Sequence, residues 1–152
     1  MTDYPLIKKQ IESIIHDVPY LGACLSNVTA ILYHAMNDVS WVGFYLIKDK
    51  LLVLETFQGQ PACSIIPLDK GVCGKAASER KTIIVDDVHQ FNGHIACDSE
   101  SKSEMVIPLI KKDKVLGVLD IDSYSYHRFN ENDQKNLEDI VSILLKELQN
   151  LF

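Results

Sequence analysis

The chain has 152 residues, a formal net charge of -6, an apolar fraction of 47% and a charged fraction of 24%. This length fits one domain over residues 1–152, and the composition is typical of a soluble globular protein rather than of a disordered or membrane chain. The negative charge argues against a nucleic-acid partner, which would need clustered Lys and Arg, and the short basic run at Lys111, Lys112 and Lys114 is better interpreted as a hairpin turn.

Two amphipathic helices are predicted at the start of the chain. Apolar residues recur at helical spacing over 6–15 and again over 25–36, and Pro19 and Gly22 interrupt the pattern between them. The first residues lack a basic segment followed by an apolar stretch, and no apolar run approaches the ~20 residues that span a bilayer. We therefore expect a cytoplasmic protein with no membrane partner, whose thiols are kept reduced.

The rest of the chain alternates predicted strands and helices. In order, we expect a hairpin at 40–47 and 51–57, a loop at 59–69, a helix at 74–81, a strand at 82–88, a loop at 89–103, a hairpin at 104–110 and 115–122, and a helix at 130–152 with Asn130 as its N-cap. Both hairpin turns are too short for the crossover that parallel strands require. The fold class is therefore α+β, an antiparallel sheet with helices on its faces.

Three acidic residues are predicted to converge at one end of the second hairpin. Asp120 and Asp122 in "GVLDIDS" alternate along a strand, so they share a face about 7 Å apart. Glu104 begins the strand that pairs with theirs. Acids are mostly exposed, so a solvated strand end is one interpretation. The other is a pocket in which the acids bind a cation or hold a proton, because like charges held close raise one pKa.

Two aromatic residues of the first predicted strand face the same way. Trp41 and Tyr45 lie four positions apart, and side chains alternate along a strand. Large aromatics more often pack in a core or an interface than line a ligand site. A pocket role requires the three acids to lie on the same face of the sheet.

The cysteines lie in two kinds of context. Cys24 belongs to an apolar helical stretch and is expected to pack there. Cys97 stands beside an aspartate in the polar loop "GHIACDSESKSE", and Cys63 and Cys73 lie in loop or turn sequences. Cys73 is at the start of a helix, whose dipole can stabilise a thiolate. Apart from packing, such thiols suit redox chemistry, in which one thiolate attacks and another converts the product to a disulfide.

The spacing of these cysteines does not predict a zinc site. There is no Cys-x-x-Cys pair, and a site that used His94 and Cys97 would need distant residues to complete four ligands. His89 and His94 are expected to form hydrogen bonds within their loop.

Several segments resemble the free methionine-(R)-sulfoxide reductases, which are built on a GAF domain. They are "WVGFY" at 41–45, "GQPAC" at 59–63, "GVCGKAA" at 71–77, "VDDVHQFNGHIACDSESKSEMVIPL" at 85–109 and "GVLDIDS" at 117–123. The likeness extends over nearly the whole chain. It implies a six-stranded antiparallel sheet flanked by N- and C-terminal helices, with the substrate enclosed under loops on one face.

The resemblance also implies a site and a reaction. The matching residues are a cysteine trio and an acidic, aromatic-lined pocket for free methionine-(R)-sulfoxide: Cys63, Cys73, Cys97, Glu104, Asp120, Asp122, Trp41 and Tyr45. Cys97 is expected to attack the sulfoxide sulfur while a carboxylic acid, Glu104 or one of the aspartates, donates a proton. Cys63 is the first choice for the thiol that then forms the disulfide, and Cys73 is the second.

The same resemblance implies that thioredoxin reduces the disulfide, that the protein is a homodimer, and that no metal or organic cofactor is required. The alternative is a non-catalytic GAF module that senses a small ligand or the redox state, because a fold by itself does not determine function.

Overall fold

A computed structural model describes residues 1–95, 97 and 100–152. Its helices and strands, in chain order, are α1 (Tyr4–Ile15), α2 (Leu21–Ala35), β1 (Trp41–Lys48), β2 (Leu51–Gln58), β3 (Ile65–Pro67), α3 (Gly71–Glu79), β4 (Ile83–Val85), the 3-10 turn η1 (Val88–Gln90), β5 (Ser103–Lys111), β6 (Lys114–Ser123) and α4 (Glu131–Glu147). In this part of the chain, no helix has the length and apolar character that a membrane span needs.

The strands form one six-stranded sheet in the order β3-β2-β1-β6-β5-β4, and all neighbours are antiparallel. The predicted α+β class with a six-stranded antiparallel sheet is therefore confirmed. The pattern of the sequence had indicated a loop over 59–69, and this was wrong for Ile65–Pro67, which pairs with β2 as a short edge strand. A strand of this length is too short to display the alternation by which strands are recognised.

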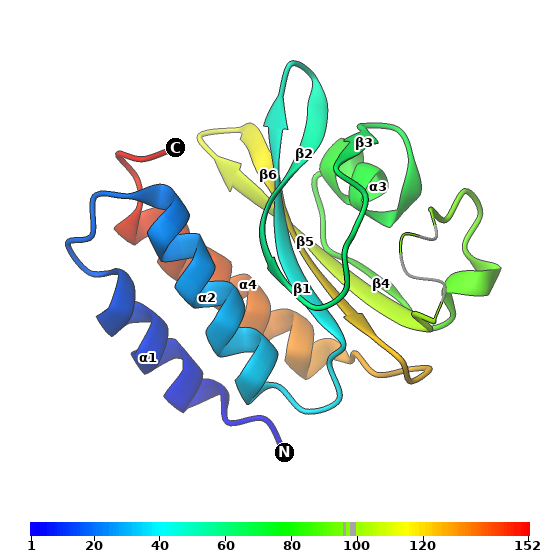
Figure 1. Cartoon of the computed structure of the whole chain (residues 1–152), viewed down its shortest axis with the longest axis horizontal. Coiled ribbons are helices and arrows are strands. Elements are labelled where there is room, and N and C mark those ends of the chain that lie inside the picture. Colours follow the sequence, from blue (N-terminus) through cyan, green and yellow to red (C-terminus); the bar gives the residue numbers. More distant parts are fainter. Residues whose placement is uncertain (96, 98–99) are drawn as a thin grey trace.

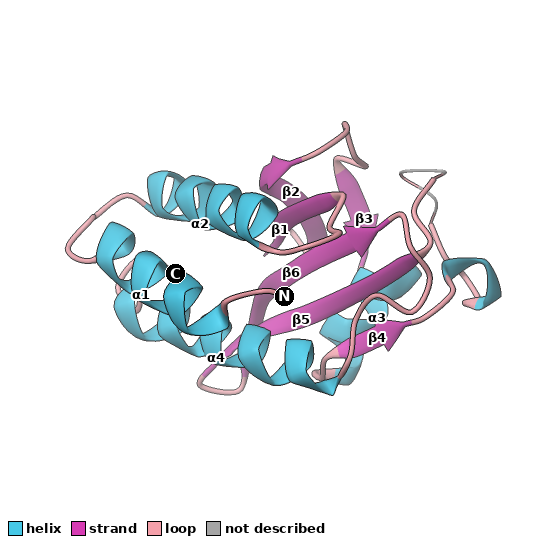
Figure 2. Cartoon of the chain, turned by 90° about the horizontal axis from the view of Figure 1, so that it is seen from below, coloured by secondary structure: helices cyan, strands magenta, loops and turns pink. Residues whose placement is uncertain are grey.

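Helices α2 and α4 cover one face of the sheet, α1 packs against these two helices, and α3 lies on the other face (Figure 1 and Figure 2). Side chains that alternate along the strands divide the interior accordingly. On β1, Val42, Phe44 and Leu46 pack against the helical layer, whereas Trp41 and Tyr45 belong to the cluster around α3. The same alternation on β5 and β6 puts the three predicted acids on the α3 face.

The termini of the helices follow from their sequences. Asp3 caps α1 by accepting a hydrogen bond from the Leu6 backbone N–H at 3.0 Å. Asn130 caps α4, as predicted, in a reciprocal capping box with Asp133. The predicted helix at 74–81 instead begins at Gly71, so Cys73 lies in its first turn. Cys24 is 1% exposed in the helical layer, which confirms the expected packing.

Candidate active site

A cavity lies where α3 and two loops meet the face of β1, β5 and β6. All the predicted site residues except Cys63 line it, and Cys63 is bonded to one that does. The cavity is small, about 40 Å³. The walls come from segments far apart in the sequence, so only the sheet register and the packing of α3 bring these residues together.

The register of the sheet gathers the three acids. Glu104 on β5 is paired with Asp122 on β6, and Asp120 is paired with Gly43 on β1. Glu104 and Asp120 are each only 6% exposed. The interpretation of this strand end as solvated was therefore wrong for both of them, because α3 and the loops cover it.

Burial and mutual repulsion change the protonation of these acids. Burial raises the pKa of Glu104 well above its ordinary value, and the nearby charges of Asp120 and Asp122 raise it further. Burial also raises the pKa of Asp120, but hydrogen bonds from Glu104 and Cys73 oppose that rise. The cluster therefore favours the protonated form of Glu104, which hydrogen-bonds to Asp120 and Asp122. The site thus holds a neutral acid beside a carboxylate.

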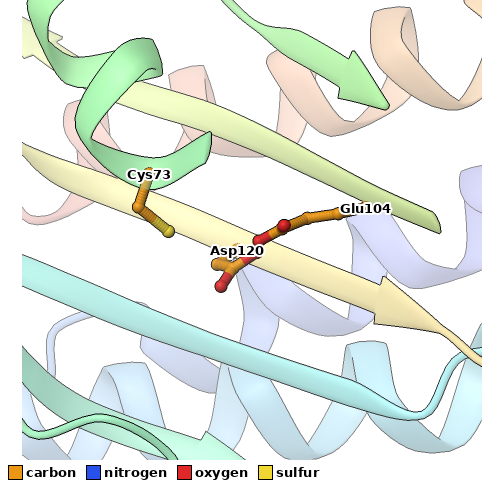
Figure 3. Close-up of side chains that lie close together, drawn as sticks. All are labelled: Cys73, Glu104 and Asp120. Carbon is orange, nitrogen blue, oxygen red and sulfur yellow. The ribbon is translucent and has the colours of Figure 1, made fainter. Parts of the chain in front are cut away.

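The second hydrogen-bond donor to Asp120 is the thiol of Cys73. Figure 3 shows its sulfur directed from α3 toward Asp120 and Glu104, and the three polar groups lie within 4.8 Å of one another. Burial raises the pKa of the Cys73 thiol well above its ordinary value, and the charge of Asp120 raises it further. The expected stabilisation of a thiolate by the helix dipole was wrong, because desolvation and neighbouring carboxylates outweigh it.

A metal ion could in geometric terms use the same three groups, Cys73, Glu104 and Asp120. Their observed arrangement already has an internal explanation, since a neutral acid and a neutral thiol hydrogen-bond to a carboxylate. The expectation that no metal is needed stays a prediction.

A disulfide joins Cys63 and Cys97 at the edge of the cavity. Their Cα atoms are 5.5 Å apart, although 34 positions separate them in the sequence. Cys97 lines the cavity and Cys63 lies in the loop between β2 and β3. Cys73 is a free, buried thiol. Of the two thiols considered as the partner of Cys97, the structure pairs Cys63 with it.

Two aromatic rings form the wall opposite α3. Trp41 and Tyr45 are buried and stacked, with ring centroids 6.1 Å apart. Gly43 makes room for the indole, because a Cβ at this position would lie 2.3 Å from a carbon of the Trp41 ring. These aromatics and the acids do share a face, as a pocket role requires.

Sequence reasoning missed two polar side chains that line the cavity. His94 was expected to serve its loop, but its Nε2 lies 3.9 Å from Glu104 Oε1, and burial lowers the pKa of this imidazole. Ser101 is 5% exposed, and its hydroxyl has no hydrogen-bond partner among the described residues; the same holds for Asp120 Oδ1. Ser101 lies in a polar run that looks solvated, so its burial carries no signal in the sequence.

Comparison with known proteins places this arrangement in a family. The GAF domain model matches residues 22–144. The free methionine-R-sulfoxide reductase of Escherichia coli is 48% identical over 126 residues, which cover 83% of this chain and 76% of that protein. The chain belongs to the free methionine-R-sulfoxide reductases. Members of this family are oxidoreductases, so the predicted family is confirmed.

Solved structures of the reductase family superimpose closely on this fold. The reduced form of the enzyme from Staphylococcus aureus has a TM-score of 0.94 at 53% identity, covering 97% of this chain and 96% of that one. Its complex with substrate has a TM-score of 0.92, with 97% of each chain covered. The Neisseria meningitidis reductase, also solved with its substrate, has a TM-score of 0.93 at 41% identity, covering 96% and 88%.

Proposed function

We propose that this protein reduces free methionine-(R)-sulfoxide to methionine with thiol electrons. The observation that carries the proposal is that the Cys63–Cys97 disulfide and a buried acid cluster with a raised pKa lie at the same cavity. A thiol supplies the electrons and a neutral acid supplies the proton, and sulfoxide reduction needs both. A ligand sensor needs neither, and a redox sensor needs the disulfide but not the acid, which favours the reductase over the sensing alternative.

In the first step, the Cys97 thiolate attacks the sulfoxide sulfur and Glu104 donates its proton to the sulfoxide oxygen. The oxygen passes to Cys97, so that methionine leaves and Cys97 becomes a sulfenic acid. The substrate sulfur gains two electrons and the Cys97 sulfur loses two. Glu104 suits the role of donor because burial and the neighbouring carboxylates raise its pKa well above its ordinary value and so favour its protonated form.

In the second step, the thiol of Cys63 attacks the Cys97 sulfenic acid. The S–O bond breaks, the S–S bond forms, and the hydroxyl leaves as water with a proton. Cys63 is assigned this role because its Cα lies 5.5 Å from that of Cys97, and a disulfide joins the two side chains. Cys73 keeps its proton and its contact with Asp120, so its role is to hold the acid cluster rather than to exchange disulfides.

The cavity also offers a basis for recognising a free amino acid. Asp120 Oδ1 is a buried acceptor without a partner among the described residues, and it suits the α-ammonium of the substrate. The Ser101 hydroxyl, buried in the same cavity, is available to donate to the α-carboxylate or the sulfoxide oxygen. Trp41 and Tyr45 supply the apolar wall against which the thioether end of the substrate packs.

The remaining parts of the proposal concern the protein in its cell. A dithiol protein of the thioredoxin type reduces the Cys63–Cys97 disulfide, the protein is cytoplasmic, and residues 1–152 act as one GAF domain that forms a homodimer. Light scattering of the purified protein tests the dimer. Disulfide reduction in the presence of thioredoxin, its reductase and NADPH tests the reductant.

The decisive experiment mixes the fully reduced protein with each sulfur epimer of free methionine sulfoxide. We expect one equivalent of methionine and the loss of two thiols per chain with the R epimer, and neither change with the S epimer. Failure to release methionine from either epimer would sink the enzyme proposal and return the chain to the sensing alternative.

A further inference from the structure

The polar groups of the two cavity aromatics bind the backbone of one loop. The Trp41 indole N–H donates to the Gln60 carbonyl at 3.0 Å, and the Tyr45 hydroxyl donates to the Cys63 carbonyl at 3.0 Å. Both side chains are almost fully buried, with exposed fractions of 3% and 1%. Strand β1 therefore holds the loop that carries Cys63 at two points, one of them on the cysteine itself.

The two anchors are rigid. The Trp41 ring is stacked with both Tyr45 and Phe57, with centroids 6.1 and 5.5 Å away. Buried rings in such a stack have few alternative positions, so their polar groups are fixed in space. A hydrogen bond from a fixed donor restricts its acceptor more than one from a mobile side chain does.

Among the described residues, the hydrogen bonds that hold the loop itself lie mostly at its two ends. It leaves β2 at Gly59, where φ is +126° and where a Cβ would lie 2.6 Å from the Trp41 ring. It joins the sheet again where the Leu54 N–H donates to the Ser64 carbonyl at 2.9 Å, just before β3. Between these points lie the two residues whose carbonyls the aromatics bind. In the reduced protein, where the bond to Cys97 is open, these two hydrogen bonds and the packing of Ala62 and Cys63 against the α3-face cluster hold Cys63 in place.

We propose that Trp41 and Tyr45 are positioning residues for the second half of the reaction, holding Cys63 where it meets the Cys97 sulfenic acid. This inference rests on the proposed function and adds a role to residues assigned above only to the pocket wall. In the step concerned, the Cys63 sulfur attacks the Cys97 sulfur, the S–O bond breaks and water leaves. Correct placement dominates the rate of such a step, because misplacement by about 1 Å can slow a reaction on the order of 100-fold.

The test follows the sulfenic acid directly. Reduced protein receives one equivalent of hydrogen peroxide, which oxidises the Cys97 thiolate to the sulfenic acid without any methionine sulfoxide. Disulfide formation is followed by the loss of thiols, and the surviving sulfenic acid is trapped with dimedone and measured by mass spectrometry. A second series with methionine-(R)-sulfoxide gives the ratio of disulfide formation to methionine release.

In Tyr45→Phe, which keeps the ring and removes the hydroxyl, we expect disulfide formation to slow about tenfold and the dimedone adduct to accumulate, in keeping with the loss of one buried hydrogen bond. Trp41→Phe should slow it about threefold, because its bond lies three residues from Cys63. Tyr4→Phe is the matched control, since it also removes a buried tyrosine hydroxyl bond, to Asp133, on the other face of the sheet. It should form the disulfide at the wild-type rate.

The positioning role would be overturned if Tyr45→Phe formed the disulfide as fast as the wild type. It would also be overturned if Tyr4→Phe slowed disulfide formation as much as Tyr45→Phe does. The peroxide series keeps this result separate from the proposed function. A protein that forms the disulfide after peroxide but releases no methionine from the sulfoxide would refute the reductase activity and leave the positioning of Cys63 intact.

Discussion

The two faces of the sheet treat a buried carboxyl group in opposite ways. On the helical face, Asp133 is 5% exposed and accepts hydrogen bonds from the Tyr4 hydroxyl at 2.5 Å, the Arg128 guanidinium at 3.1 Å and the Asn130 backbone N–H at 3.0 Å. On the α3 face, Glu104 and Asp120 are equally buried, but no Lys or Arg is among the described residues that line their cavity.

The difference separates stability from chemistry. A buried charge with a counter-ion and hydrogen bonds ties α1, α4 and the segment between β6 and α4 together. Burial without a counter-ion favours the protonated form of an acid, as the raised pKa of Glu104 indicates. The second arrangement does little for the fold, but it suits the proton donor and the ammonium-binding acid of the proposed reaction. The predictions below test this division.

The largest expected effect is the complete loss of reduction in Cys97→Ser, because a hydroxyl is a far poorer nucleophile toward sulfur than a thiolate. The measurement is methionine released per chain from the free R epimer. Cys24→Ser, in the helical layer, is the control and should keep turnover near normal. Stoichiometric release of methionine by Cys97→Ser would show that another residue is the nucleophile.

The second prediction concerns the missing counter-ion. If the substrate α-ammonium supplies it, then acylation of the amine removes the charge and leaves the buried carboxylate unpaired. We expect kcat/KM for N-acetyl-methionine sulfoxide to be at least about a thousandfold lower than for the free R epimer, or roughly 4 kcal/mol. Asp120→Asn should reduce the difference in kcat/KM between the two substrates, because it weakens the binding of the free substrate. Similar kcat/KM values for the two substrates would rule out recognition of the ammonium by the acids.

The third prediction concerns the buried carboxylate on the helical face. Asp133→Ala leaves Arg128 without its partner and removes half of the capping box, so we expect the free energy of unfolding to fall by about 3 kcal/mol. Urea unfolding of the reduced protein measures it. At temperatures where the variant is folded, its kcat should stay within about twofold of the wild type, a small change for a substitution across the sheet. A fall in the kcat of the folded variant well beyond this twofold range would show that the two faces are coupled.

Which parts of the site were predictable depends on how local their causes are. The convergence of Glu104 with Asp120 and Asp122 follows from strand alternation and a short turn, so the sequence pattern was sufficient. The resemblance supplied the cysteine trio. The protonated state of Cys73 was not predictable, because it depends on how α3 packs over the acids.

Other features were missed for a similar reason. Ser101 and His94 come from a polar loop whose composition indicates exposure, and only tertiary packing buries them in the cavity. The edge strand Ile65–Pro67 exists because β2 offers a free edge, not because three residues have a strong intrinsic preference.

The smallest expected effect is also the most specific test of the acid cluster. In Glu104→Gln, a neutral amide of similar shape replaces an acid that burial and two neighbouring carboxylates keep protonated. The folded protein holds this proton above the pH at which the unfolded chain releases it, so the wild type loses stability as pH rises from the ordinary pKa of glutamate toward the raised value. The variant lacks this titration. We therefore expect the two proteins to have similar free energies of unfolding near pH 4, and the variant to become progressively more stable than the wild type as the pH rises toward 8. The measurement is urea unfolding of both reduced proteins across this range, in which the difference between them isolates Glu104. The same substitution should slow methionine release, because the proton donor is lost. A stability difference that does not change with pH would mean that Glu104 is ionised in the folded protein, and the comparison between the two faces would then fail at its central residue.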